Sequence, residues 1–203
     1  MIDNMGKHPF DPCLAINWAL ETCLHLSSDC GSGVSDNTRS LSTRWSPPAP
    51  GMLKINSDGA FLQDRGTGAA GAVVRDSSGN FCAASARWLG PVGSTLIAEA
   101  EAIRDGLRLI PQGTMEHIIG ETDAQEVVAL WKNRTRQRSK IAAILKEIQE
   151  IASAFTSFEL IHVRREAKFV AHTCARFASS SLDSPPKKRF ELCQSGRPQV
   201  PYL

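Results

Sequence analysis

Three acidic residues that lie far apart in the chain, Asp58, Glu99 and Asp123, occupy positions from which they could act together. The first of them closes a short run in which Leu53 and Ile55 alternate with polar residues, and a glycine follows it directly. This pattern predicts a strand that ends at Asp58. Sheets with crossing helices place their chemistry at the carboxyl ends of strands, and carboxylate oxygens are the ligands that hard divalent cations prefer. The three acids therefore predict a site that holds a divalent metal ion.

Glu99 lies in a predicted helix that begins after Ser94 or Thr95 and runs to about residue 110. An apolar stripe along one side of this helix predicts the face that packs on a sheet. Its members are Leu96, Ala100, Ile103, Leu107 and Ile110. Glu99 lies at the edge of this stripe, whereas Glu101 points to the opposite side. Glu99 is therefore the glutamate that we expect to face the sheet.

Asp123 follows a predicted strand at 117–122 and precedes a predicted helix at 124–131. Its placement is like that of Asp58, because each carboxylate lies where a predicted strand ends. An Asp before a helix is also a common capping residue, so capping alone is a second interpretation of Asp123.

The other predicted elements complete a mixed α/β arrangement. Two short runs at 72–75 and 81–86 flank a turn and predict an antiparallel hairpin after the first strand. A further strand is predicted at 158–163, and two helices at 141–155 and 167–180. The glycines at 66, 68 and 71 favour a tight turn over a phosphate-binding loop, because a strand and not a helix follows them.

The 203 residues suit one domain of about 130 to 150 residues with additional segments at both ends. We assign residues 1–50 to an amphipathic helix at 12–27 and a linker rich in Ser, Gly and Pro. Residues 51–181 form the predicted folded domain. Residues 182–203 form a tail that we expect to be disordered, and its basic cluster at 187–189 is a weak indication of a nuclear location.

Composition narrows the class of protein. The net charge of +2 is too small to indicate nucleic acid by itself. The six cysteines contain no C-x-x-C pair, which favours reduced thiols in an intracellular, soluble protein over a disulfide framework or a zinc site. No run approaches 18 apolar residues, and no secretory signal begins the chain, so we expect no membrane association.

A basic segment between two predicted helices could contact phosphates. It contains Lys132, Arg134, Arg136, Arg138 and Lys140, with no acidic residue among them. The alternative is a solvated connector with no binding role.

Five local motifs lie at residues 54–60, 71–76 with Gly79, 98–107, 121–125 and 163–172. These motifs and the order of the elements resemble the ribonuclease H family, in particular the domains of plant non-LTR retroelements. The resemblance covers about residues 45 to 180. It implies a five-stranded mixed sheet, with three antiparallel strands followed by two parallel ones, flanked by helices.

The resemblance also implies roles for individual residues. Asp58, Glu99 and Asp123 match the first three metal-binding carboxylates of the family, which implies Mg²⁺ or Mn²⁺ as the cofactor. The family supplies a fourth Asp from its last helix, with an Asn four residues earlier, where this chain has His172 and Lys168. An imidazole is a poor ligand for Mg²⁺. The resemblance therefore gives His172 a catalytic role on a water or a phosphate.

The function that this resemblance implies is metal-dependent hydrolysis of the RNA strand of RNA/DNA hybrids, by a protein that we expect to be monomeric. The alternative is a nucleic-acid-binding domain of the same fold whose cleavage activity is weakened or lost through the change at His172. A third hypothesis is an interaction domain that uses the helix at 12–27 to bind a partner protein.

Overall fold

The computed structural model describes residues 45–111, 116–136, 138–164, 169–180 and 189–193. The predicted helix at 12–27, most of the predicted tail and Lys168 lie outside these residues. The elements are β1 Met52–Leu62, β2 Thr67–Arg75, β3 Phe81–Pro91, α2 Thr95–Arg108, β4 His117–Thr122, α3 Gln125–Lys132, the short 3-10 helix η1 Arg134–Arg136, α4 Ala142–Ala152, β5 Ser157–His162, α5 Phe169–Ser180 and β6 Arg189–Cys193. Within the described ranges, no helix has the length and apolar character that crossing a lipid bilayer requires.

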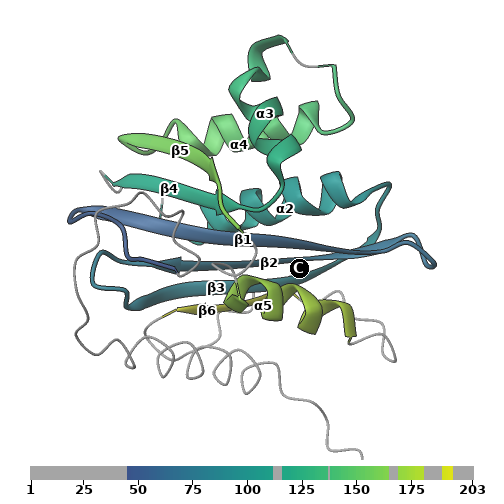
Figure 1. Ribbon diagram of the computed structural model, residues 1–203, viewed down its shortest axis with the longest axis horizontal. Coiled ribbons are helices and arrows are strands. Elements are labelled where there is room, and N and C mark those ends of the chain that lie inside the picture. Colours follow the sequence, from purple (N-terminus) through teal and green to yellow (C-terminus); the bar gives the residue numbers. More distant parts are fainter. Residues whose placement is uncertain (1–44, 112–115, 137, 165–168, 181–188, 194–203) are drawn as a thin grey trace, which may run out of the picture.

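The strands form one sheet in the order β5-β4-β1-β2-β3-β6, with helices on both sides (Figure 1). β1, β2 and β3 pair in antiparallel fashion, whereas β4 pairs parallel with β1 and β5 pairs parallel with β4. The predicted α/β fold, with three antiparallel strands followed by two parallel ones, is therefore confirmed.

β6 is a sixth strand that the sequence analysis does not predict. It pairs in antiparallel fashion with the outer edge of β3 and lies within the segment that was expected to be disordered. For residues 189–193 that expectation is wrong. Phe190 and Leu192 do alternate with other residues, but the run is short and follows a stretch of Pro and Lys that hides its periodicity. Pairing supplies the backbone hydrogen bonds that the edge of β3 would otherwise lack.

A hydrophobic core fills the space between one face of the sheet and the helices α2, α3 and α4. Its largest fully buried side chains include Ile55, Ile103, Leu107, Ile118, Val127, Leu145 and Ile148. α2 begins as predicted, because the Ser94 hydroxyl accepts a hydrogen bond from the backbone nitrogen of Ile97 at 3.4 Å. The apolar stripe of α2 packs on the sheet, and this packing fixes the direction in which Glu99 points.

The opposite face of the sheet is covered by α5. The stripe of small residues that the sequence indicates, Ala171, Cys174, Ala175 and Ala178, is buried. A side chain at Gly71 would place its Cβ only 2.4 Å from the carbonyl oxygen of Ala171, so the helix backbone lies directly on β2. This close approach fixes α5 beside the middle of the sheet.

The segment before β1 packs on the domain and is not a free linker up to Pro50. The Arg75 guanidinium lies 4.3 Å from the ring centre of Trp45, and the Lys54 ammonium donates to the carbonyl of Ser46 at 2.7 Å. Pro48 is buried. The packed domain therefore includes residues 45–50, which the sequence analysis assigned to the linker because their Pro and Ser content is typical of one.

Candidate active site

Asp58 does not end its strand, in contrast to the prediction. β1 continues to Leu62, and Asp58 pairs with Gly71 in the middle of the β1–β2 ladder. The pairing of β1 with β4, however, stops at Asn56 and Glu121, so Asp58 lies just beyond the end of the parallel part of the sheet. Gly59 is a point of close approach and not a turn. A Cβ there would lie 2.4 Å from the backbone nitrogen of Glu99, so only a glycine lets α2 cross β1 at this height.

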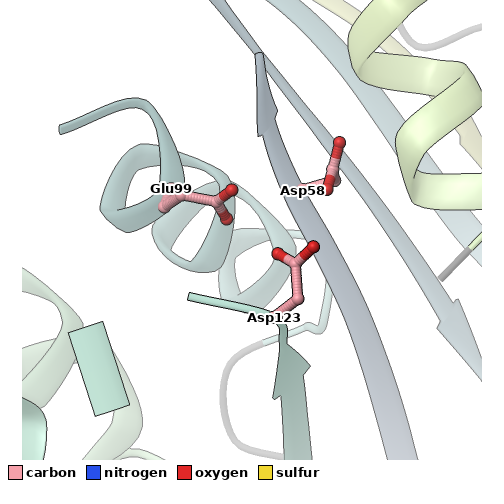
Figure 2. Close-up of side chains that lie close together, drawn as sticks. All are labelled: Asp58, Glu99 and Asp123. Carbon is pink, nitrogen blue, oxygen red and sulfur yellow. The ribbon is translucent and has the colours of Figure 1, made fainter. Parts of the chain in front are cut away.

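The three predicted carboxylates come together at this crossing (Figure 2). One oxygen from each of Asp58, Glu99 and Asp123 lies within 4.8 Å of the other two. Asp58 and Glu99 are buried, with 2% and 5% of their surface exposed, and Asp123 is half-buried. Carboxylate oxygens gathered in this way are donors that suit Mg²⁺ or Mn²⁺. The residues therefore fit a divalent cation.

Thr122 joins two parts of this cluster, and the sequence analysis did not select it. Its hydroxyl donates a hydrogen bond to Glu99 Oε2 at 3.3 Å and accepts one from the backbone nitrogen of Ala124 at 3.1 Å. The side chain is fully buried. Thr122 therefore ties the carboxylate on α2 to the turn that carries Asp123. The only signal in the sequence is a hydroxyl residue directly before the acid, which is also typical of a helix start.

Glu121, directly before Thr122 on β4, is a further buried acid, but a cation already balances its charge. Its carboxylate forms an ion pair of 2.8 Å with Lys54 and accepts a hydrogen bond of 2.6 Å from the side-chain amide of Asn56. All three side chains are buried. This pairing explains why the alternation of Lys54 and Asn56 in β1 places polar residues inside the protein.

His172 reaches the cluster from α5. Its Nδ1 lies 2.9 Å from Asp58 Oδ2, and a third of the imidazole surface is exposed. The structure thus brings the last helix to the first carboxylate, as the resemblance implies, with an imidazole in place of a carboxylate.

The basic segment lies outside the cluster, and its members differ from one another. Lys132, Arg138 and Lys140 are exposed. Arg134 is held by the protein itself, because its guanidinium lies 4.1 Å from the ring centre of Trp131 and donates to the Trp131 carbonyl at 3.0 Å. The side chain of Arg136 is outside the described part of the chain. Phosphate contact by this segment stays a prediction.

α2 is anchored to the sheet by a partly buried ion pair beyond Glu99. Arg87 on β3 contacts both carboxylate oxygens of Asp105, at 2.6 and 3.1 Å, and also contacts Glu101. Burial alone lowers the pKa of Arg87, but the charges and hydrogen bonds of Asp105 and Glu101 raise it above its ordinary value. The guanidinium therefore stays charged and holds α2 at a fixed height on the sheet.

Comparisons with known proteins agree with this architecture. A family model described as reverse transcriptase-like matches residues 56–178. A protein of Arabidopsis thaliana named "Putative ribonuclease H protein" is 24% identical over 163 residues, which are 80% of this chain and 26% of that protein. The chain thus spans about a quarter of the length of this curated relative.

Two solved structures show the same fold. Ribonuclease H1 from the archaeon Halobacterium salinarum superposes with a TM-score of 0.59 at 20% identity, over 64% of this chain and 99% of that chain. The ribonuclease H1 called LC11, solved in complex with an RNA/DNA hybrid, gives a TM-score of 0.54 at 19% identity, over 65% and 99% of the two chains. At these identities the likeness establishes the fold and not the activity.

Proposed function

The chain belongs to the reverse transcriptase-like family, and from this premise we propose that it is a metal-dependent endoribonuclease that hydrolyses the RNA strand of RNA/DNA hybrids. The convergence of oxygens from Asp58, Glu99 and Asp123 within 4.8 Å is the observation that carries the proposal. These residues come from three separate elements, β1, α2 and the turn after β4. Like charges gathered in a mostly buried place repel one another, and a bound cation offsets that repulsion.

Asp58, Glu99 and Asp123 would hold Mg²⁺ or Mn²⁺. When bound, such a cation polarises a phosphate oxygen and lowers the pKa of a bound water. The chain contributes the fixed arrangement of the carboxylates. Thr122 orients the Glu99 carboxylate, and the close contact at Gly59 sets the distance between β1 and α2. His172 orients Asp58 through the 2.9 Å contact.

The substrate class is supported by the fold and by the basic segment. LC11 ribonuclease H1, which shares the fold, was solved with an RNA/DNA hybrid. The exposed side chains of Lys132, Arg138 and Lys140 suit contacts to phosphates, which set the register of a duplex without reading its sequence. The 2′-hydroxyl groups of RNA would then distinguish the strand that is cut.

One observation favours a second candidate function. His172 stands where the family resemblance expects a carboxylate, which removes one oxygen ligand from the site. A chain with weakened or no cleavage would still bind hybrids through its basic segment. In this alternative, nucleic acid is still the partner, but its cleavage is weakened or lost.

A cleavage assay on a labelled hybrid, with Mg²⁺ and then with Mn²⁺, tests the proposal. We expect cleavage of the RNA strand, and a loss of more than about 100-fold in rate for Asp58→Asn, because mutation of a mere outer-sphere partner of a metal already costs 10–100-fold. Glu150→Gln is the matched control, since Glu150 is an exposed acid on α4. Absence of cleavage with both cations, together with hybrid binding that weakens with salt, would instead establish the binding domain.

A further inference from the structure

Lys54 contacts two separate parts of the chain at once. Its ammonium donates to the carbonyl of Ser46 at 2.7 Å and forms an ion pair of 2.8 Å with Glu121 Oε1. Only 8% of the Lys54 side chain is exposed, and only 6% of the Glu121 side chain. A buried charge has lost its water, so oxygens of the protein must replace that water. Lys54 therefore joins the chain before β1 to strand β4.

The chain before β1, residues 45–50, covers this ammonium, and we call it the covering segment. The Trp45 ring centre lies 5.6 Å from the Lys54 ammonium and 4.3 Å from the Arg75 guanidinium. An aromatic face and the Ser46 carbonyl thus lie where water would otherwise solvate the Lys54 ammonium. Opening of the covering segment would expose this ammonium to water and weaken its ion pair with β4, because charges attract less strongly in a medium of high dielectric constant.

Glu121 connects this ion pair to the acidic cluster. Asn56 donates to the second carboxylate oxygen of Glu121 at 2.6 Å, so both oxygens are held from β1. The next residue, Thr122, donates its hydroxyl to Glu99 Oε2 at 3.3 Å. Asp123 follows and is one of the three grouped acids. A displacement of Glu121 therefore moves the two residues that complete the cluster from the β4 side.

Lys54 and the covering segment lie outside the residues that the family model matches, which begin at Asn56. We propose that Lys54 is a positioning residue for the candidate metal site, and that the covering segment controls the affinity for the cation through Lys54. This inference rests on the proposed metal-dependent function and adds a means of control. Coupling between two sites is reciprocal, so a closed covering segment tightens cation binding and a bound cation holds the covering segment closed.

A purely structural role for Lys54 is the competing explanation. Loss of one partner from a buried ion pair destabilises a whole domain. In that case a variant that is still folded would bind cations with unchanged affinity. The two explanations therefore differ in the cation affinity of the folded protein and in the response of the covering segment to the cation.

Hydrogen exchange of the unmodified full chain, followed by NMR with and without saturating Mg²⁺, measures that response. The backbone nitrogen of Met52 donates to the Ala49 carbonyl at 3.1 Å, so its exchange reports opening of the covering segment. We expect this exchange to slow by about tenfold with Mg²⁺, within the usual range of coupling between sites. The amide of Ser153, which donates to Gln149 at the end of α4, is the control and should not respond.

Substitution of Lys54 tests the effect on affinity. Lys54→Met should weaken Mn²⁺ binding, measured by electron paramagnetic resonance, by about tenfold or more, as removal of an orienting group typically does. Lys54→Arg, which keeps a cation, should recover most of the affinity. Ile148→Ala is the matched control for stability, because it empties a fully buried position on α4 and contributes nothing to the cluster. It should lower the urea midpoint and leave Mn²⁺ affinity unchanged.

Trp45 provides a second test that does not disturb the buried pair directly. Trp45→Ala should weaken Mn²⁺ binding by about fivefold, the lower end of such couplings, and Trp45→Phe, which keeps an aromatic ring over the cations, should not. In a Lys54→Met background, Trp45→Ala should have no further effect, because the covering segment acts through Lys54.

The outcomes separate this inference from the proposed function. Unchanged Mn²⁺ affinity in Trp45→Ala, or equal slowing of exchange at Met52 and Ser153, overturns the inference and leaves a metal-dependent nuclease in place. Equal losses of affinity in Lys54→Met and Ile148→Ala also overturn it, because stability alone then explains them. Mg²⁺ and Mn²⁺ that do not bind the unmodified protein contradict both.

Discussion

Thr122 shows how one buried hydroxyl can decide the geometry of the cluster. It donates to Glu99 and accepts from the backbone of Ala124, so its single oxygen links α2 with the turn of Asp123. Without the hydroxyl, the Glu99 carboxylate loses a donor in a place that water cannot easily enter. The residue acts on the cation only through the residues that would hold it.

We therefore predict that Thr122→Val weakens Mn²⁺ binding by about 10–100-fold, the usual effect of removing a group that orients a ligand. Valine has a similar volume and suits a strand, so the fold should persist. Thr122→Ser, which keeps the hydroxyl, is the control and should bind nearly as the wild type does. Titration calorimetry gives both affinities. Equal affinities for the valine and serine variants would show that the hydrogen bond to Glu99 has no role in the site.

At the scale of single residues, the sequence predicts the three candidate metal ligands better than it predicts the residues that hold the surrounding strands in place. Asp58, Glu99 and Asp123 each stand at a recognisable point of a patterned segment, so their convergence could be expected. The contacts of these other residues depend on the register between strands. Asn56 bonds to Glu121 only because the two residues lie side by side in the pairing of β1 with β4. Register between distant parallel strands leaves no local pattern in the chain, so the pairing of Lys54 with Glu121 could not be foreseen.

At the scale of elements, the site depends on how closely α2 crosses β1. Gly59 permits this crossing, since a Cβ there would lie 2.4 Å from the Glu99 nitrogen and 2.5 Å from the carbonyl carbon of Ala98. Both are backbone atoms, so no side chain can rotate to make room. The sequence analysis recognised Gly59 as a special position but interpreted it as the end of a strand. Turns and close backbone contacts both favour glycine, so the sequence alone does not distinguish them.

Gly59→Ala should push α2 away from the sheet and lower the free energy of unfolding by about 1–3 kcal/mol, the usual cost of overpacking. It should also weaken Mn²⁺ binding, because Glu99 moves with the helix. Gly93→Ala is the matched control: its Cβ would meet only the Ile97 side chain, at 3.4 Å. Urea unfolding and metal titration of both variants test the prediction. A Gly59→Ala protein as stable as Gly93→Ala would contradict the close packing.

The ion pair between Arg87 on β3 and Asp105 on α2 is a second interaction that holds this helix on the sheet. Asp105 is almost fully buried, with 1% of its side chain exposed, and Arg87 binds both of its oxygens. Removing the guanidinium leaves a buried carboxylate without its partner, which typically costs 3–5 kcal/mol. An exposed pair between the same helix and α4, Arg108 with Glu147, lacks that penalty.

Arg87→Met should therefore lower the free energy of unfolding by about 3 kcal/mol or more, since methionine replaces the aliphatic part of the side chain but not its charge. Arg108→Met should change it by less than about 1 kcal/mol. Urea unfolding at neutral pH measures both. Similar losses for the two variants would show that burial of Asp105 does not determine the strength of the pair.

At the scale of the whole molecule, the acidic cluster includes Asp123 just before α3, whereas the basic segment begins with Lys132 at the other end of that helix. The near-neutral composition, with a net charge of +2, conceals this separation. The sequence does locate the basic segment, but it could not show that the members are unequal. Arg134 packs on Trp131, whereas Lys132, Arg138 and Lys140 are exposed. Arg134 differs because the short 3-10 helix after α3 places its guanidinium against Trp131, near the end of α3.

The difference in exposure between Arg134 and the three exposed residues leads to a prediction about hybrid binding. Each phosphate contact releases a counterion, which makes the logarithm of affinity fall with the logarithm of salt concentration by about 0.9 per contact on duplex DNA. Replacing Lys132, Arg138 and Lys140 together by Gln should reduce that slope by about 2 to 3 if all three contact phosphates. Arg134→Gln should reduce it less and should mainly destabilise α3, because its guanidinium already has a partner within the protein.

Fluorescence anisotropy with a labelled hybrid at several salt concentrations gives the slopes, with Ca²⁺ in place of Mg²⁺ to suppress cleavage. Lys146→Gln is the control, because Lys146 is an exposed cation on α4 outside the basic segment. An unchanged slope in the triple variant would remove the segment from the nucleic-acid interface. An equal loss in the Lys146 variant would show that charge anywhere on this side of the molecule attracts the hybrid, with no contact specific to the segment.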